Sequence, residues 1–455
     1  MNKKQISAFV LSGLLFSQVA VTLAQEISVK DIKKYVVEMD KSLYVPYDGE
    51  TKGFEDGFVT GFGSAITFKG LDKDGNPEFW GLTDRGPNAD APSVKLSEDE
   101  TLTSKIFPSP KFTPSIGLIS MKDDKATVLE TISLKDKDGK EISGLPVSPD
   151  SVGFSGEVAL SESMEDLGND DNGKDTEGIA VDKDGNFWIS DEYGPFITQF
   201  DKDGKELLRL APGEGLPEII ADRIPNRGFE GLTITPSGNI VATVQSVLDI
   251  DGETAKTALF TRVVEYNPET KETKMYAYPV VKDDYEKVKD CKIGDIYAIS
   301  DTRFLMIEQG KDAKGEMQNR IFTFDISDAT DLTNQTVDEK ELEFVDNLED
   351  LKDFKFGTKE LLVDLRAEGW TAEKAEGLVL FNDNKSLAII NDNDFGIKTV
   401  TEDPDNEGAD ITDYLYDFEK KTYSLEDKEA KPSISIAANE DKSELWILEF
   451  ADALK

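Results

Sequence analysis

The chain of 455 residues contains no histidine and one cysteine. Without histidine it cannot build a Ser-His-Asp or Cys-His catalytic group, and a zinc site with imidazole ligands is excluded as well. A single cysteine forms no intramolecular disulfide and no thiolate cluster. A phosphate-loop phosphatase would need arginine where the chain has Tyr297, so Cys291 is interpreted as an inert thiol. We expect no zinc, nucleotide or haem cofactor.

Basic residues are also few, with 51 Lys and Arg against 92 Asp and Glu and a formal net charge of −41. Nucleic acids and anionic membrane surfaces are bound through a surplus of Lys and Arg, so neither is an expected partner. The hydrophobic fraction of 38% and the aromatic fraction of 9% are typical of a folded chain. The composition favours cations as ligands.

Hydrophobic runs long enough to span a bilayer are missing beyond the N-terminus. There, two lysines precede an apolar stretch from Ala8 to Phe16, and Thr22-Leu23-Ala24 places small residues at positions −3 and −1 of a signal-peptidase site. An uncleaved membrane anchor is the alternative, but the run is short and interrupted by polar residues. We predict a signal peptide over residues 1–24, one domain over residues 25–455, and a secreted or periplasmic protein without a membrane span after cleavage.

Short strand-like runs alternate with turn signals along the rest of the chain. In residues 177–211, four apolar runs are separated by two DKDG sequences and a bend at Tyr193–Pro195. Asp-Gly between apolar runs is a strong hairpin signal, because glycine takes the positive φ of the tight turn. Similar meanders occupy residues 62–134, 229–280 and 293–326, and another begins at residue 375.

The recurring meander predicts an all-β fold, a β-propeller of about six four-stranded antiparallel blades. The last strands, PSISIAA and ELWILEF, are expected to close with the N-terminal KYVVEMD as a shared blade. A β-sandwich is the alternative, but it does not explain why the same strand–turn–strand pattern recurs. The acidic segment from Asp338 to Phe354 is predicted to be a short helical insert.

Acidic residues occupy corresponding places in these units. The first strand of a unit often begins with an acid beside glycine, and the second often ends in an acid or amide. In a propeller the first strands line the central channel, so such positions converge, and carboxylates gathered there repel one another unless a cation compensates. Turn chemistry is the alternative for any single residue. The predicted metal ligands are Asp84, Glu177, Glu230, Glu308, Glu376 and Asp392.

Oxygen ligands of this kind select hard ions, so Ca²⁺ is the expected metal, with Mg²⁺ or Mn²⁺ as alternatives. Arg85 follows Asp84, and Arg227 shortly precedes Glu230. A guanidinium beside such a centre can bind an oxyanion through its planar fork, or it can simply neutralise neighbouring acids.

The blocks FWGLTDRGPN, TEGIAVDKDGNFWISDEYGPFITQF, NRGFEGLT, IGDIYAISDTRFLMIEQG and AEGLVLFNDNKSLAIINDNDFG resemble the phytase-like family of exported bacterial proteins. Its domain is described as an "esterase-like activity of phytase" domain, and the resemblance covers roughly residues 55–400. It implies a β-propeller, export, and hydrolysis of phosphoesters or esters. The positions that carry it are Asp84, Arg85, Glu177, Asp191, Glu192, Arg227, Glu230, Glu308, Glu376, Asp392 and Asp394.

Two classes of function follow. The first is a divalent-metal-dependent hydrolase of phosphomonoesters or simple esters that acts through metal-activated water. In it, Asp191 or Glu192 serves as the base and Arg85 or Arg227 holds the oxyanion. The second is a non-catalytic exported propeller that binds a ligand and contains a structural calcium ion. A small phosphate or ester is the expected partner, and the protein is expected to be a monomer.

Overall fold

The computed structural model describes residues 28–455, and the predicted signal peptide lies outside the described residues. Within residues 28–455 the secondary structure consists of β-strands and short 3₁₀ turns, with no α-helix. None of these turns is a helix long and apolar enough to cross a membrane. The turns are η1 (Lys41–Leu43), η2 (Glu218–Asp222), η3 (Ile250–Gly252), η4 (Lys282–Asp284), η5 (Val288–Asp290), η6 (Leu342–Phe344), η7 (Asp394–Gly396) and η8 (Ile411–Asp413).

Five four-stranded antiparallel units, which we call blades, make up the larger part of the described chain, and the first and last are joined into one eight-stranded sheet. Blade 1 contains β2 (Ala65–Leu71), β3 (Pro77–Leu82), β7 (Ser115–Lys122) and β8 (Lys125–Ser133). Blade 2 contains β10 (Thr176–Val181), β11 (Phe187–Asp191), β12 (Phe196–Phe200) and β13 (Glu206–Pro212), and β14 (Gly215–Leu216) extends it. Blade 3 contains β15 (Phe229–Ile234), β16 (Ile240–Val244), β17 (Phe260–Tyr266) and β18 (Thr273–Pro279).

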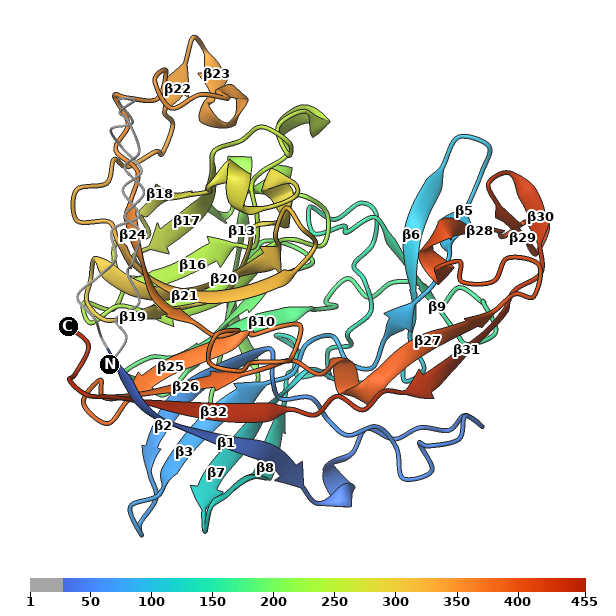
Figure 1. Cartoon of the computed structure of the whole chain (residues 1–455), viewed down its shortest axis with the longest axis horizontal. Helices are drawn as coiled ribbons and strands as arrows, with labels where there is room; N and C mark the ends of the chain where they lie inside the picture. Colours follow the sequence, from blue (N-terminus) through green and yellow to red (C-terminus); the bar gives the residue numbers. More distant parts are fainter. Residues whose placement is uncertain (1–27) are drawn as a thin grey trace, which may run out of the picture.

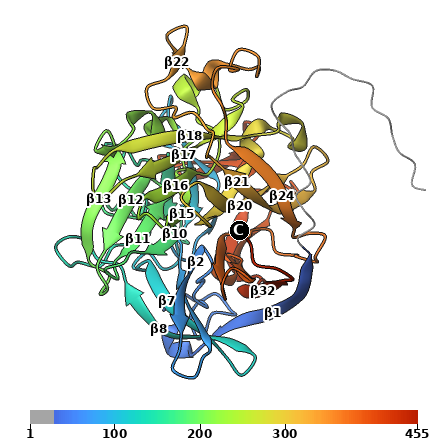
Figure 2. The ribbon, with the colours of Figure 1, turned by 90° about the vertical axis from the view of Figure 1, so that its left-hand side faces the viewer.

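Blade 4 contains β19 (Lys292–Ala298), β20 (Arg303–Lys311), β21 (Met317–Asp325) and β24 (Thr358–Asp364). Blade 5 combines β25 (Gly377–Phe381), β26 (Ser386–Ile390) and β32 (Glu444–Phe450) with the N-terminal β1 (Val29–Met39). The five first strands, β2, β10, β15, β19 and β25, contact one another in a closed cyclic order. The sheets radiate from this ring (Figure 2), which is the arrangement of a β-propeller.

The blade count differs from the expected six, while the shared closing blade is confirmed. β1 pairs antiparallel with β32, as Tyr35 opposite Leu445 shows, and it then pairs in parallel with β8 of blade 1. The N-terminal strand therefore joins the first and last blades. The segment PSISIAA does not take part, because it forms β31 (Ser433–Ala438) in a separate lobe.

That second lobe is built from insertions in blades 1 and 5 and from the connection between blades 1 and 2 (Figure 1). Its strands are β4 (Ala89–Asp90), β5 (Ser93–Lys95), β6 (Thr101–Ile106), β9 (Glu157–Leu160), β27 (Ile397–Glu402), β28 (Tyr414–Asp417), β29 (Thr422–Leu425), β30 (Lys428–Ala430) and β31. Segments distant in sequence pair here, as β28 does with β5. The lobe has its own apolar core, which includes Val94, Leu160 and Ile436.

The hairpin turns within the blades form as their sequences predict. In the DKDG turn between β10 and β11, Asp182 Oδ1 accepts hydrogen bonds of 2.9 Å from the amides of Asp184 and Asn186. Gly185 takes a φ of 84°, which favours glycine. This turn pairs Val181 with Phe187 and so fixes the register of the whole hairpin.

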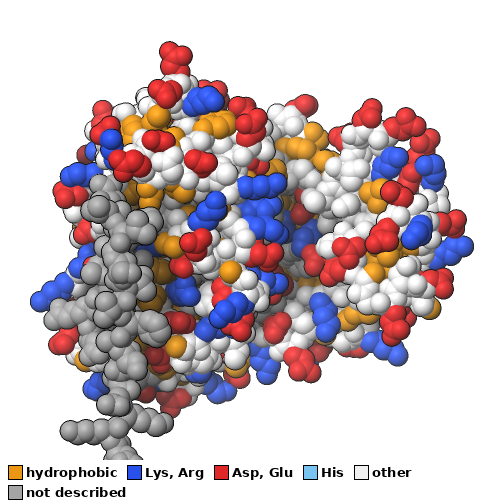
Figure 3. Space-filling view, turned by 45° about the horizontal axis from the view of Figure 1, so that its top comes forward, with side chains coloured by type: hydrophobic (Ala, Val, Ile, Leu, Met, Phe, Trp, Pro, Cys, Tyr) orange, Lys and Arg blue, Asp and Glu red, His pale blue; other side chains and the backbone are white. Residues whose placement is uncertain are grey.

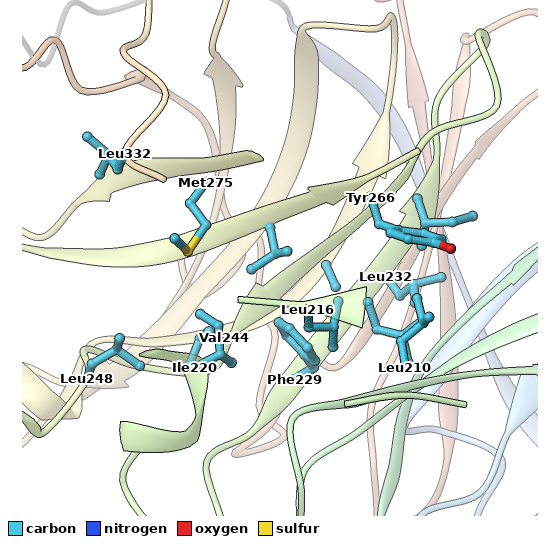
Figure 4. Packing of buried hydrophobic residues seen from close by; sticks show 14 of the residues in the cluster. Leu210, Leu216, Ile220, Phe229, Leu232, Val244, Leu248, Tyr266, Met275 and Leu332 are labelled. Atoms are coloured by element: carbon cyan, nitrogen blue, oxygen red, sulfur yellow. The ribbon is translucent and has the colours of Figure 1, made fainter. Parts of the chain in front are cut away.

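The predicted helix from Asp338 to Phe354 is wrong. The segment contains β23 (Lys340–Glu341), paired with β22 (Thr336–Val337), followed by η6 and turns. Asp338 and Glu339 have positive φ values of 49° and 62°, which a helix cannot accommodate. Leu342 and Leu351 pack instead on the apolar cluster between blades 2 and 3, part of which Figure 4 shows. The buried Glu343 carboxylate also pairs with Arg262 Nε at 2.7 Å, which fixes the segment to blade 3.

Candidate functional site

The strand register places one residue of each blade at the same level near the start of its first strand. In blade 1 the Ser64 amide donates to Leu82 O, and Ala65 pairs with Leu82. In blade 5 the Glu376 amide donates to Ile390 O in the same way. The register of blades 2, 3 and 4 shifts at the corresponding point, and such bulges re-aim side chains. We call these positions the inner ring: Ser64, Glu177, Glu230, Gly294 and Glu376.

The glycine beside each acid has a packing role. An ideal Cβ atom on Gly231 would lie 2.5 Å from Ile296 N and 2.6 Å from Asp295 Cα in the next blade. Gly377 is similarly close to Ile66 N, at 2.8 Å. The two residues of the recurring acid–glycine pair thus have separate roles. The glycine lets neighbouring first strands approach each other, and the acid faces the ring.

Replacing Gly231 by alanine should therefore destabilise the protein. The added methyl group meets backbone atoms that cannot rotate away, and overpacking of this kind typically costs about 1–3 kcal/mol. Urea unfolding of the variant and the wild type measures the difference. A free energy of unfolding within about 0.5 kcal/mol of wild type, the usual range for a neutral surface change, would contradict the packing role.

A second set of equivalent positions lies on the second strand of each blade. Each position comes two residues after the residue that pairs with the neighbour of the inner-ring residue. Leu82 and Ile390 occupy the same register in blades 1 and 5, so Asp84 and Asp392 are equivalent. In blade 2, Ser190 pairs with Gly178 as Leu82 and Ile390 pair with the corresponding residues of their blades. Glu192, two residues after Ser190, is therefore equivalent to Asp84 and Asp392. We call these positions the outer ring: Asp84, Glu192, Gln245, Gln309 and Asp392. Acids thus come from blades 1, 2, 3 and 5, and blade 4 supplies none to either ring.

Glu308, a predicted metal ligand, does not join the other acids. Its neighbour Gln309 occupies the outer ring, and adjacent residues of a strand face opposite sides. The Glu308 carboxylate is fully buried, pairs with Lys359, and accepts hydrogen bonds of 2.7 Å from the hydroxyls of Tyr278 and Tyr285. This network occupies both carboxylate oxygens.

Asp191 lies behind the site for the same reason of alternation. Its Oδ1 accepts hydrogen bonds from the amides of Asp175 and Tyr193, at 3.2 and 3.1 Å. Its Oδ2 lies 3.3 Å from the buried Lys174 Nζ. Asp191 therefore holds the backbone of the site, while the adjacent Glu192 lines the cavity. In blade 4 the glycine precedes the acid, as Gly294-Asp295. Asp295 does not join the ring acids either, since it accepts hydrogen bonds of 2.8 Å from the amides of Ile296 and Leu378.

Three carboxylates converge at the centre of the site. Asp175, Glu177 and Glu192 each offer an oxygen, and these oxygens lie within 4.8 Å of one another. All three residues are buried. Sequence reasoning missed Asp175, although it stands two positions before Glu177 on the same strand edge and so shares its direction. We call these three residues the carboxylate group.

Burial and mutual repulsion perturb the acids of both rings. Burial, followed by the charge of neighbouring carboxylates, raises the pKa values of Glu177 and Glu230 well above their ordinary value. Burial and then Asp175 raise the pKa of Glu192 to about 7. The pKa of Glu376 is raised to about 8, mainly by burial. A cation at the rings would relieve this cost.

Lys374 already neutralises one side of the site. Its Nζ lies 2.9 Å from Asp392 Oδ2, 3.0 Å from Asp394 Oδ1 and 3.9 Å from Glu376 Oε1. Lys374 accordingly lowers the pKa of Asp394 to about 2. Asp392 and Asp394 thus have a built-in counter-charge. Among residues 28–455, the site acids without an ion pair are Asp84, Glu177, Glu192 and Glu230. Lys374 stands two residues before Glu376, and sequence reasoning missed it.

The two arginines differ in access to the site. Arg85 lines the cavity, and its Nη1 contacts Glu157 Oε1 at 3.0 Å and Asp175 Oδ2 at 3.4 Å. Its amide also donates to Asp175 Oδ1 at 3.1 Å, so Arg85 fixes this acid twice. Arg227 donates to the carbonyl of Lys289 and does not line the cavity.

Asp84 and the carboxylate group line a cavity of about 610 Å³, to which residues of both the propeller and the second lobe contribute. Lys and Arg side chains gather in the hollow where the two parts meet (Figure 3), although the protein as a whole is strongly acidic. Lys105 and Lys398 of the second lobe line the cavity together with Thr399, Thr401 and Asn439. Asp90, which pairs with Lys105 at 2.6 Å, and Asp410 line the cavity too, so the wall as a whole suits a polar ligand.

The donor set fits a hard divalent cation. The carboxylate group offers oxygen atoms, and nearby Gln245 donates from Nε2 to Glu192 at 2.6 Å and to Glu230 at 2.9 Å. Gln245 Oε1 is buried without a hydrogen-bond partner among residues 28–455, so one more oxygen there is free. Oxygen donors without nitrogen or sulfur are the ligands of Ca²⁺, Mg²⁺ and Mn²⁺.

Comparison with known proteins gives one family and several distant similarities. The sequence profile of the phytase-like family, "Esterase-like activity of phytase", matches residues 59–395. An "Uncharacterized secreted protein" of Arthroderma benhamiae is 29% identical over 237 residues, which cover 42% of this chain and 45% of that relative. The chain thus aligns with less than half of the relative's length.

The similarity of this chain to solved structures is weak. A protein from Lactobacillus plantarum is 12% identical with a TM-score of 0.31, covering 82% of this chain and 98% of its own. Virginiamycin B lyase from Staphylococcus aureus is 10% identical with a TM-score of 0.25, covering 81% of this chain and 99% of its own. At these scores the similarities carry no argument about function.

Proposed function

Because the chain belongs to the phytase-like family, we propose that it is a divalent-metal-dependent hydrolase of phosphomonoesters or simple esters, exported from the cell. The observation that carries the proposal is the carboxylate group, which lies beneath a polar cavity beside Arg85. Ca²⁺ is the proposed metal, with Mg²⁺ or Mn²⁺ as alternatives. The name of the Arthroderma benhamiae relative supports export, as does the sequence of residues 1–24.

Asp175, Glu177 and Glu192 would hold the cation, with Glu230 close by. A divalent cation supplies polarisation of the ester oxygen and a lowered pKa for water. The chain's own residues supply binding and proton transfer. Asp191 keeps the backbone amides of Asp175 and Tyr193 in place, so we now assign it a positioning role.

Glu192 is the proposed general base. Its pKa is raised to about 7 in the metal-free protein, and a bound cation would lower it, so Glu192 would be ionised and able to accept a proton at neutral pH. Its carboxylate is held by Gln245 Nε2 at 2.6 Å and lines the cavity. Arg85 faces the same cavity, and its planar guanidinium is the proposed partner for the oxyanion of the substrate.

Replacing Glu192 by glutamine tests this assignment. The purified protein is assayed on p-nitrophenyl phosphate and p-nitrophenyl acetate, after EDTA treatment and after Ca²⁺, Mg²⁺ or Mn²⁺ is restored. We expect metal-dependent turnover in the wild type and a loss of about 100-fold or more in the variant, because a positioned base contributes about that much.

Glu373→Gln is the matched control, because Glu373 lines the same cavity outside the carboxylate group. It should keep turnover within about threefold of wild type, a change of under 1 kcal/mol in the barrier. Calcium binding without turnover on any ester would favour the alternative, a non-catalytic propeller with a structural cation. Turnover that survives EDTA unchanged would overturn the metal-dependent mechanism.

A further inference from the structure

Ser64 is the one hydroxyl residue of the inner ring, and none of the assignments above uses it. Its amide donates to Leu82 O at 3.2 Å, as the Glu376 amide does to Ile390 O at 3.1 Å. The two residues therefore hold the same position in blades 1 and 5. Blade 1 lies between blades 2 and 5 in the ring, so Ser64 stands between Glu177 and Glu376.

The Ser64 hydroxyl is buried and unpaired. The residue is 1% exposed, and none of residues 28–455 makes a hydrogen bond with its Oγ. A buried hydroxyl without a partner costs about 1–3 kcal/mol, so a further partner is expected at this point. The neighbouring first strands are packed tightly there, since an ideal Cβ on Gly377 would lie 3.0 Å from the Ala65 carbonyl carbon.

We propose that Ser64 Oγ is a further, neutral oxygen ligand of the calcium ion that the carboxylate group holds, next to Glu177 of the inner ring. This proposal rests on the proposed function, because it concerns the same cation. Glu177 and Glu376 flank Ser64, and the charge of Glu376 contributes to the raised pKa values of Glu177 and Glu230. A hydroxyl adds an oxygen without adding repulsion among these carboxylates. Ca²⁺ takes six to eight oxygen ligands in flexible geometry, so the ring favours it over the strictly octahedral Mg²⁺.

Two variants test the role of the hydroxyl, with calcium binding measured by isothermal titration calorimetry. Ser64→Ala should weaken Ca²⁺ binding by about tenfold or more, in the range expected when a site loses a group that supports the metal. Ser443→Ala is the matched control, since Ser443 also has a buried Oγ without a partner and lies outside the rings. It should leave the Kd within about twofold of wild type, less than 0.5 kcal/mol.

The Ser64→Cys variant distinguishes a metal ligand from a structural serine, because only a ligand would change which metal the site prefers. Sulfur replaces oxygen at nearly the same place, and soft sulfur ligands favour soft metals. We expect weaker Ca²⁺ binding and tighter Cd²⁺ binding than in the wild type. The melting temperature in EDTA should stay at or above that of wild type in both Ser64 variants, because an unpaired hydroxyl is removed.

The outcomes separate the two proposals. Wild-type Ca²⁺ binding with equal affinity in Ser64→Ala, and no gain of Cd²⁺ affinity in Ser64→Cys, would overturn the role of Ser64 and leave the proposed function standing. An absence of Ca²⁺ binding in the wild type would overturn the role of Ser64, and an absence of Ca²⁺, Mg²⁺ and Mn²⁺ binding would overturn both.

Discussion

Replacing Glu177 by glutamine is expected to weaken calcium binding at least about tenfold and to reduce turnover at least about 100-fold. Glu177 is the residue common to the inner ring and the carboxylate group, so its charge acts at both levels of the site. Burial, and then Asp175 and Glu230, raise its pKa well above the ordinary value, which is the sign of a carboxylate whose charge lacks a counter-ion.

The same substitution should stabilise the metal-free protein. At neutral pH, folding must either protonate this carboxylate or bury its charge, and both oppose folding; glutamine is neutral, has nearly the same shape and avoids that cost. We therefore expect Glu177→Gln to melt at a higher temperature than wild type in EDTA and to gain less from added Ca²⁺. Differential scanning calorimetry with EDTA and with Ca²⁺ measures both effects. A variant less stable than wild type in EDTA would mean that Glu177 is a structural residue rather than a metal ligand.

The stability of the metal-free protein should fall between pH 5 and pH 8. Glu192 and Glu376 have an ordinary pKa of 4.5, and their pKa values in the folded protein are raised to about 7 and about 8. In this window the folded state retains protons that the unfolded state has lost, so the free energy of unfolding decreases as pH rises. Each group contributes a slope of at most about 1.4 kcal/mol per pH unit.

Calcium should reverse this trend, because the cation binds the deprotonated carboxylates and its affinity rises as they lose their protons. Urea unfolding at pH 5.0, 6.5 and 8.0, in EDTA and in excess Ca²⁺, tests the prediction. Asp394, with its pKa lowered to about 2, titrates below the window and does not affect it. A metal-free stability that stays constant or increases from pH 5 to pH 8 would show that the ring acids are not protonated in the folded state.

The propeller arrangement and most of the ring acids could be predicted from the sequence. Asp-Gly turns between apolar runs specify each hairpin locally. Because the same meander repeats along the chain, few sheet topologies other than a propeller can accommodate it. Glu177, Glu230 and Glu376 were identified because each stands beside a glycine that the packing of first strands requires. The expected helix from Asp338 to Phe354 failed because its fold depends on tertiary contacts, above all the pair between Arg262 and Glu343.

Errors at the site arose where the sequence does not show which face of a strand a residue takes. Asp191 and Glu192 are adjacent, as are Glu308 and Gln309, and one bulge or one residue of register exchanges their directions. Asp175 and Lys374 were missed, although each stands two residues before a ring acid, because neither adjoins the glycine that marked Glu177 and Glu376. The second lobe pairs β28 with β5, more than three hundred residues apart in sequence, and no local pattern reveals such a contact.

The most direct measurement is an X-ray structure of crystals grown with Ca²⁺ and, in parallel, with Mn²⁺ as an anomalous scatterer. We predict an anomalous peak between Asp175, Glu177 and Glu192, with carboxylate oxygens at about 2.3–2.6 Å from Ca²⁺. A site without a peak at saturating metal, or a peak only elsewhere on the acidic surface, would contradict the central claim that these carboxylates hold the cation.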